Sequence, residues 1–315
     1  MNKLNKLLNE IAEVTSKAAI SCYPWIGIGD EKNADNAAVE SIRQSLNNLD
    51  ISGTIIIGEG ERDNAPMLYI GEKVGKSGIE IDIAVDPLEG TTLCAHNKSD
   101  AISVLAISNI NTMLHAPDIY MEKIATGNNL PKNLVDLDQS IEKNLKALAK
   151  AKHCLVSDLN ICVLNRPRHS EIIKELRLLN ARVTLIDDGD VLACLKTCLE
   201  GGNIDMYLGI GGAPEGVLAA AGLKCLGGQI QCRLIFNTSH EIERANSMGI
   251  TDITKKYNVE DMINGDVIFS ATWITDGYLK GIKKLSSTHH VTKTLLLSSR
   301  PSTIMTIKTE FKTAY

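Results

Sequence analysis

Apolar residues recur three or four positions apart in several stretches of this chain, and this spacing predicts amphipathic helices. The first stretch carries its apolar residues at Leu4, Leu7, Leu8, Ile11, Val14 and Ala18. A second pattern follows Asp35 and places Ala38, Ile42, Leu46 and Leu49 on one face. Further helical patterns lie at residues 141–148, 170–179, 191–199 and 215–226, and the polar stretch 237–246 is expected to be a loop that runs into a short helix.

Short runs of β-branched and other apolar residues predict strands between these helices. The runs lie at residues 55–57, 80–85, 102–107, 161–164, 183–186, 206–210, 267–271 and 294–297. Because helical and strand patterns alternate, the sequence predicts a layered α/β fold with mixed or parallel sheets covered by helices. The Asn- and Lys-rich segment 127–152 is the expected boundary between an N-terminal lobe, residues 1–150, and a C-terminal lobe, residues 151–315.

Composition and charge are those of a soluble protein with neither a nucleic-acid nor a membrane partner. The net charge is −5 and aromatic residues make up 4% of the chain, so the sequence offers no basic patch with interleaved stacking rings. No apolar run approaches the roughly 20 residues that span a bilayer. The N-terminus has neither a hydrophobic signal core nor an Arg/Ser-rich transit pattern. We therefore expect the protein to act in the compartment where it is made.

The eight cysteines are expected to be reduced core residues. None forms a Cys-x-x-Cys pair, and most lie inside apolar runs, as Cys162 does. Cys194 and Cys198 lie one helical turn apart, which is a spacing open to a metal or a redox pair, but no histidine or further cysteine lies beside them. This usage is typical of an intracellular protein in a reducing compartment.

The most informative chemistry lies in the turn Asp86-Pro87-Leu88-Glu89-Gly90-Thr91, which directly follows a predicted buried strand. Two carboxylates three positions apart across a Pro/Gly turn can point at one spot, where they share divalent cations. The hydroxyl of Thr91 then lies within reach of whatever those cations hold. The turn therefore predicts metal-dependent phosphate chemistry.

Other acidic residues also follow predicted strands. Glu59 and Glu61 come after residues 55–57, and Glu215 comes after 206–210, at the strand ends where open α/β sheets bind ligands. Oxygen ligands without His or Cys suit Mg²⁺ or Mn²⁺. Asp35, which precedes the second helical pattern, is a further candidate ligand. Each of these four acidic residues also has an interpretation without a metal. Asp35 could be a helix N-cap, Glu59 and Glu61 could be solvated turn residues, and Glu215 could be a charge favoured at a helix start. Taken together, they favour a metal site.

Three further segments are candidates for binding a phosphorylated substrate. Residues 166–169, Arg-Pro-Arg-His, form a cationic cluster whose guanidinium groups fit phosphate, or else a solvated loop. Residues 187–190, Asp-Asp-Gly-Asp, either cap a helix or supply Asp188 or Asp190 as an acceptor for polyol hydroxyls. The glycine-rich segment 209–216 departs from the dinucleotide motif at Pro214, but its backbone N–H groups at a helix start can hold a phosphate oxygen.

These segments, taken in order, resemble the successive signatures of class II fructose-1,6-bisphosphatases, within the lithium-sensitive phosphatase superfamily. The matching segments cover nearly the whole chain: Asp35, residues 58–61, 86–91, 116–121, 166–169, 188–190 and 211–216. Arg166 and the run 60–63 look closest to the cyanobacterial and plastid type, which also hydrolyses sedoheptulose-1,7-bisphosphate. The resemblance implies an αβαβα sandwich of the sugar-phosphatase type with mixed sheets. It also implies hydrolysis of the 1-phosphate of fructose-1,6-bisphosphate to fructose 6-phosphate and phosphate.

The resemblance also implies residue roles. Asp35 and Glu59 would hold one divalent metal, and Asp86, Glu89 and Glu215 another. Thr91, oriented by Asp35 or Glu61, would aim the attacking water. The 1-phosphate would lie at Glu89, Gly90 and Thr91. The sugar and the distal phosphate would be bound by Tyr120, Arg166, Pro167, Arg168, Asp188, Gly189, Asp190 and Gly212.

The implied cofactors are two or more Mn²⁺ or Mg²⁺ ions per active site, and the implied assembly is a homo-oligomer, either a dimer or a tetramer. Asn, Ile and Lys usage is typical of an AT-rich genome, which would place the protein in the plastid stroma if it is organelle-encoded and in the cytoplasm otherwise. Two alternatives stay open. An inositol-monophosphatase-like activity fits the acidic turn, although the two arginines favour a second phosphate on the substrate. A non-catalytic sugar-phosphate sensor would keep the fold but is expected to lose metal carboxylates, and all five are present.

Overall fold

The computed structural model describes residues 3–60 and 68–312, which belong to two compact units. The first unit comprises residues 1–113 and 265–315, and the second comprises residues 114–264. The division differs from the predicted boundary at residue 150. The reason is that the C-terminal strands return to the first sheet, so the chain leaves the first unit once and comes back.

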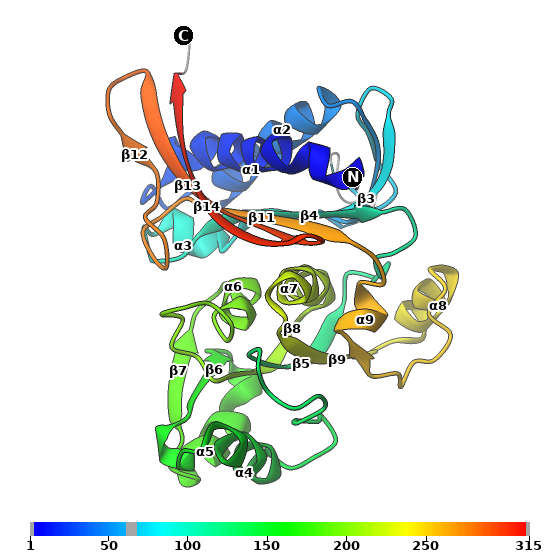
Figure 1. The fold of residues 1–315 in the computed structure, drawn as a ribbon, viewed down its shortest axis with the longest axis vertical. Coiled ribbons are helices and arrows are strands. Elements are labelled where there is room, and N and C mark those ends of the chain that lie inside the picture. The colour runs from blue at the N-terminus through cyan, green and yellow to red at the C-terminus, as the bar shows by residue number, and fades with distance from the viewer. Residues whose placement is uncertain (1–2, 61–67, 313–315) are drawn as a thin grey trace. The chain divides into compact units, whose positions relative to one another are not determined.

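The described residues of the first unit form an eight-stranded mixed sheet in the order β12-β13-β11-β4-β3-β1-β2, with β14 paired to β13 (Figure 1). Its strands are β1 (Ile51–Ile57), β2 (Lys73–Val74), β3 (Ile79–Glu89), β4 (Ile102–Asn109), β11 (Val267–Trp273), β12 (Lys283–Lys284), β13 (His289–Ser299) and β14 (Ser302–Lys312). β1 and β3 are parallel, and the other pairs are antiparallel. Its helical segments are η1 (Lys3–Leu7), α1 (Leu8–Cys22), η2 (Tyr23–Trp25), α2 (Glu31–Asn47) and α3 (Thr91–Ala95).

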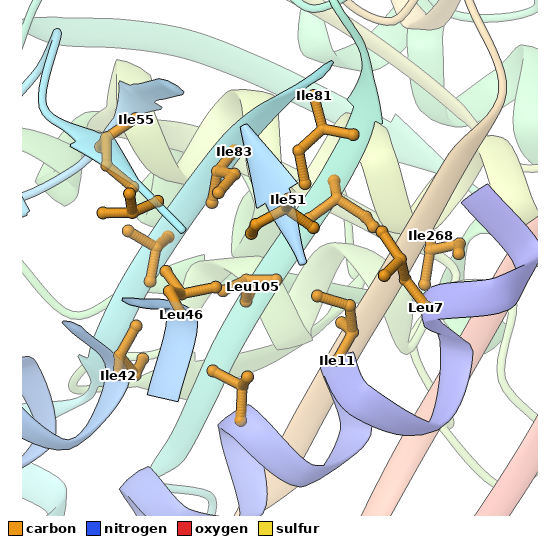
Figure 2. Packing of buried hydrophobic residues seen from close by; sticks show 14 of the residues in the cluster. Leu7, Ile11, Ile42, Leu46, Ile51, Ile55, Ile81, Ile83, Leu105 and Ile268 are labelled. Carbon is orange, nitrogen blue, oxygen red and sulfur yellow. The ribbon is translucent and has the colours of Figure 1, made fainter. Parts of the chain in front are cut away.

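The core of the first unit is aliphatic and lies between the sheet and the helices α1 and α2. Ile11 of α1 and Ile42 of α2 are fully buried and belong to one cluster with Ile55, Ile83 and Leu105 of the sheet (Figure 2). Each buried aliphatic side chain contributes about 1.5–3 kcal/mol relative to an exposed one. The packing therefore fixes the strands whose ends carry the acidic residues.

Residues 114–264 form the second unit around a six-stranded mixed sheet in the order β10-β9-β5-β8-β6-β7. Its strands are β5 (Tyr120–Thr126), β6 (Asn160–Leu164), β7 (Arg182–Ile186), β8 (Met206–Gly212), β9 (Gln229–Leu234) and β10 (Tyr257–Asn258). Its helices are α4 (Ile141–Lys152), α5 (Ser170–Leu178), α6 (Asp190–Leu195), α7 (Ala213–Leu226), α8 (Ser239–Ser247) and α9 (Val259–Met262), with short turns η3 (Val156–Asp158) and η4 (Pro167–His169).

Successive residues of β5 show which helices cover each face of this sheet. Ile124 packs in one cluster with Leu145 of α4 and Leu176 of α5. The preceding residue, Lys123, points to the other face, towards Gly216 at the start of α7. Helices therefore cover both faces, and the prediction of an α/β fold with mixed sheets is confirmed.

All eight predicted strands and the predicted helices are present, and the loop at residues 237–246 does run into a helix, α8. The predictions omitted β5, β9 and β14, and also the two-residue strands β2, β10 and β12. β5 carries Glu122 and Lys123 among apolar residues, and β14 alternates between half-buried and exposed residues, so neither shows a continuous apolar run in the sequence. All eight cysteines lie among the described residues and are free thiols, six of them buried, as predicted. No described helix is long and apolar enough to cross a membrane.

Candidate active site

A β-bulge near the end of β3 aligns the two carboxylates of the acidic turn. Asp86 lies opposite Val104 of β4, and Glu89 lies opposite Ile102, so three steps along β3 match two along β4. Residues three apart in a regular strand point to opposite faces, but the extra residue of the bulge returns Glu89 to the face of Asp86. Their carboxylate oxygens lie within 4.8 Å of one another. The predicted convergence of Asp86 and Glu89 is thus present in the first unit.

The turn then passes directly into a short helix. Gly90 adopts the left-handed conformation (φ 88°) and is the N-cap of α3, so Thr91 is the first helical residue. A Cβ on Gly90 would lie 2.8 Å from Cδ1 of Leu93. Both the backbone angle and the packing therefore require glycine here. As a result, Glu89, Gly90 and Thr91 follow one another tightly, with Glu89 buried and Thr91 half-buried.

Glu59 occupies the equivalent position at the end of the neighbouring strand. β1 and β3 are parallel, and Ile57 is in register with Ala84. Glu59 and Asp86 each lie two residues beyond this pair, at adjacent carboxyl ends. The N–H of Glu59 donates to the carbonyl of Leu68 at 2.9 Å.

Asp35 lies inside α2 and does not cap it. Asp30 is the N-cap and accepts a hydrogen bond from the N–H of Asn33 at 3.0 Å, so the N-cap interpretation of Asp35 is wrong. Burial raises the pKa of the Asp35 carboxyl group, because desolvation disfavours its charged form. A nearby cation would offset that cost. In the described residues, neither Asp35 nor Glu59 approaches Asp86 and Glu89 closely enough to share their cluster.

In the second unit, the structure brings three of the predicted substrate residues together. Tyr120 begins β5, is 48% exposed, and lies opposite Gly212 at the end of β8. The guanidinium of Arg168 stacks over the Tyr120 ring, with its Cζ 4.8 Å from the ring centroid. Arg168 Nε and Nη2 both donate to the carbonyl of Ile210, at 3.1 and 2.8 Å. These contacts fix the plane of the guanidinium.

His169 differs from the expectation that it belongs to a cationic cluster. Its side chain is fully buried, and burial lowers its pKa. Nε2 accepts the N–H of Ile210 at 2.8 Å, which assigns the proton to Nδ1, and Nδ1 donates to the carbonyl of Leu164 at 2.7 Å. His169 is therefore neutral, and the positive charge of this segment belongs to Arg166 and Arg168.

The predicted acceptor Asp190 is engaged inside the second unit. Its side chain is 5% exposed, and Oδ2 accepts hydrogen bonds from Lys123 Nζ at 2.8 Å and from the Tyr207 hydroxyl at 3.0 Å. Burial acts to lower the pKa of Lys123, but the carboxylates of Asp190 and Glu215 outweigh it and raise the pKa. Lys123 and Asp190 therefore form an internal ion pair. Asp188, two residues before Asp190, is half-buried and accepts a hydrogen bond from the N–H of Gly189 at 3.1 Å.

This ion pair explains the glycines at the end of β8. A Cβ on Gly211 would lie 2.2 Å from Asp190 Oδ2 and 2.9 Å from Lys123 Nζ. A Cβ on Gly212 would lie 1.9 Å from Glu215 Oε2, so the carboxylate of Glu215 folds back over this glycine at the start of α7. Gly211 and Gly212 therefore leave the space that these charged side chains occupy against the backbone.

The sequence-based reasoning missed Lys123, Tyr207 and the internal role of His169. A lysine between Met121 and Ile124 was the one available signal, because charged residues inside apolar strands are rare unless they are paired. Arg166 is half-buried beside Pro167, which begins η4. Glu61, predicted to orient Thr91, lies outside the described residues.

Comparison with known proteins agrees with this set of motifs. The family profile "Bacterial fructose-1,6-bisphosphatase, glpX-encoded" matches residues 5–311. The chain belongs to this family. It is 42% identical over 315 residues to "Fructose-1,6-bisphosphatase class 2" of Haemophilus influenzae, covering 95% of this chain and 94% of that protein.

A second relative within this fructose-1,6-bisphosphatase family is cyanobacterial. The Synechocystis protein named "D-fructose 1,6-bisphosphatase class 2/sedoheptulose 1,7-bisphosphatase" is 42% identical over 326 residues, with 95% of this chain and 94% of that protein covered. Among solved structures, the suhB protein of Bartonella henselae is 12% identical, with a TM-score of 0.37 over 71% of this chain and 85% of that one. That likeness is too low to bear on the fold or the site.

Proposed function

We propose that this protein hydrolyses the 1-phosphate of fructose-1,6-bisphosphate to fructose 6-phosphate and phosphate, and that it also accepts sedoheptulose-1,7-bisphosphate. The main structural support is the bulge of β3, because it turns Asp86 and Glu89 to one face directly before Gly90 and Thr91. Family membership supports the reaction, and the name of the Synechocystis relative supports the second sugar.

The proposed cofactors are two or more Mn²⁺ or Mg²⁺ ions. Asp35 and Glu59 would hold one ion, and Asp86, Glu89 and Glu215 another. The donor set fits, because it consists of carboxylate oxygens, and Asp86 and Glu89 present two of them within 4.8 Å of one another. When bound, such ions lower the pKa of a water molecule and neutralise charge on the leaving oxygen.

The chain's own residues would then position the reactants. The Thr91 hydroxyl, oriented by Asp35 or Glu61, would aim the attacking water in line with the leaving oxygen. Glu89, Gly90 and Thr91 would lie around the 1-phosphate. Uncatalysed phosphate-monoester hydrolysis is among the slowest biological reactions, with enhancements of up to ~10²¹. Orientation of the water is thus one of several effects that must act together.

The far end of the substrate would be bound by the second unit. Arg166 and Arg168, set apart by Pro167, would bind the distal phosphate, since a guanidinium presents a rigid set of donors to phosphate oxygens. The exposed ring of Tyr120 and the backbone of Gly212 would contact the sugar. In the segment from Asp188 through Gly189 to Asp190, the half-buried Asp188 is the proposed hydroxyl acceptor, while Asp190 supports the segment through Lys123.

Activity on both sugars would serve gluconeogenesis or the Calvin cycle, in the cytoplasm or the plastid stroma, and we propose a homo-oligomer as the working form. The decisive assay is phosphate release from fructose-1,6- and sedoheptulose-1,7-bisphosphate with Mn²⁺ and with Mg²⁺. Glu215→Gln removes one proposed ligand and is expected to abolish turnover. Failure on both sugars with either ion refutes the proposal, and faster release from inositol monophosphate supports the alternative.

A further inference from the structure

The parallel strands β6 and β8 diverge towards their carboxyl ends. They pair at Ile161 with Met206 and at Cys162 with Tyr207, and no later pair continues the ladder within this fully described unit. Diverging strand ends leave backbone groups that need other partners. Ile210 lies on this stretch of β8, three residues beyond the last pair.

The side chain of His169 links the two strands at the point where their backbone pairing has ended. Its ring joins the carbonyl of Leu164, the last residue of β6, to the N–H of Ile210 on β8, through hydrogen bonds of 2.7 and 2.8 Å. Arg168 donates twice to the carbonyl of the same Ile210. Two consecutive side chains thus hold both backbone groups of one residue: His169 accepts the N–H of Ile210, and Arg168 donates to its carbonyl.

The fit around the ring is tight. His169 is fully buried, and a Cβ on Gly209 would lie 3.2 Å from its Nε2. The charged groups that act on the ring are Arg168 and Asp190. The imidazole therefore acts as a fixed spacer between two strand ends, and it sets where the carbonyl of Ile210 lies.

We propose that His169 is a positioning residue for distal-phosphate specificity. It fixes Ile210, the carbonyl of Ile210 and the ring of Tyr120 fix Arg168, and Arg168 binds the distal phosphate. This inference rests on the proposed function and deepens it, because it names the group that makes a bisphosphate the preferred substrate. His169 itself does not touch the substrate.

Three substitutions separate the two hydrogen bonds of the ring. His169→Gln keeps an acceptor near the Nε2 position, His169→Asn keeps a donor near the Nδ1 position, and His169→Phe keeps the volume and removes both. Arg177→Lys is the control, because Arg177 is an exposed basic residue of α5, the helix that follows His169, and its substitution leaves both hydrogen bonds of the ring in place. The substrates are fructose-1,6-bisphosphate and fructose 1-phosphate, which has no distal phosphate.

We expect His169→Asn and His169→Phe to raise KM for the bisphosphate at least tenfold, while kcat changes less than threefold. With fructose 1-phosphate their KM should equal that of the wild type, and His169→Gln should stay within threefold of the wild type on both substrates. A purely structural role would lower the melting temperature of all three variants and leave the preference for bisphosphate unchanged. That result would overturn the inference. A wild-type protein that hydrolyses neither sugar phosphate would instead refute the proposed function.

Discussion

Replacing Lys123 by methionine tests the buried ion pair of the second unit. Methionine keeps most of the volume of the lysine stem, so the change is mainly the loss of the ammonium from a site that is 0% exposed. Oδ2 of Asp190 would lose the shorter of its two side-chain hydrogen bonds, at 2.8 Å, and keep the one from Tyr207 at 3.0 Å. Removing one partner of a buried pair costs roughly 3–5 kcal/mol, because the other charge stays desolvated.

That cost is a large part of the roughly 5–15 kcal/mol by which native proteins are stable. Because 1 kcal/mol shifts the melting temperature of a domain of about 150–250 residues by roughly 2–4 °C, we expect a decrease of roughly 6–20 °C. Chemical denaturation followed by circular dichroism, together with calorimetry, measures both quantities. The matched control is Lys146→Met, which breaks the exposed pair with Glu142 on α4 and should change the stability little, because solvent screens an exposed pair.

The triple variant Lys123→Met/Asp190→Leu/Tyr207→Phe replaces the whole network with apolar side chains. Such replacements of buried ion pairs are often neutral or stabilising, so we expect it to regain most of the lost stability. If Lys123→Met is no less stable than Lys146→Met, the buried carboxylate of Asp190 does not depend on Lys123 for its stability, and the reasoning fails.

Three further predictions concern the first unit and the His169 bridge. Thr91→Ala should lower kcat about 10²-fold at saturating metal, the lower end of the effect of a positioned proton-transfer group; an unchanged kcat in phosphate-release assays would remove its proposed role. Gly58→Ala should weaken Mn²⁺ binding, measured by paramagnetic resonance of the free ion, because its Cβ would lie 2.0 Å from the Leu68 carbonyl that holds the Glu59 N–H. Gly60→Ala meets no atom within 4 Å and should cost only about 1–2 kcal/mol for its left-handed backbone, with binding retained; equal binding by both variants would contradict the argument. The pKa of His169 is lowered by burial, so its stabilising contribution is full above the unfolded pKa near 6.5 and is lost as the pH falls through the folded pKa. The melting temperature should therefore fall more steeply below pH 6.5 in the wild type than in His169→Gln, and parallel curves would show that the ring does not titrate in this way.

The sequence alone predicted the elements whose patterns are local. Buried aliphatic runs marked β1, β3 and β4, and helical spacing marked α1, α2 and α7, because each pattern lies within one element. The turn from Asp86 to Thr91 could also be predicted from the sequence, since the spacing of its carboxylates and its Pro/Gly pair are local features. The chemistry they predict, oxygen ligands beside a phosphate, depends on residue type alone.

The tertiary structure decided what depends on partners distant in the sequence. Asp190 was predicted as a substrate acceptor, and the structure shows its Oδ2 atom held by Lys123 of β5 and Tyr207 of β8. His169 was expected to be cationic, and two backbone groups fix it as neutral. Burial and hydrogen bonding set the charge and availability of a side chain. The hydrogen-bond partners of Asp190 lie 17 and 67 positions away in the sequence, and those of His169 lie 5 and 41 positions away. The sequence by itself therefore determined which chemical groups this protein has. Only the folded chain decided which of them are buried and paired with partners in the interior.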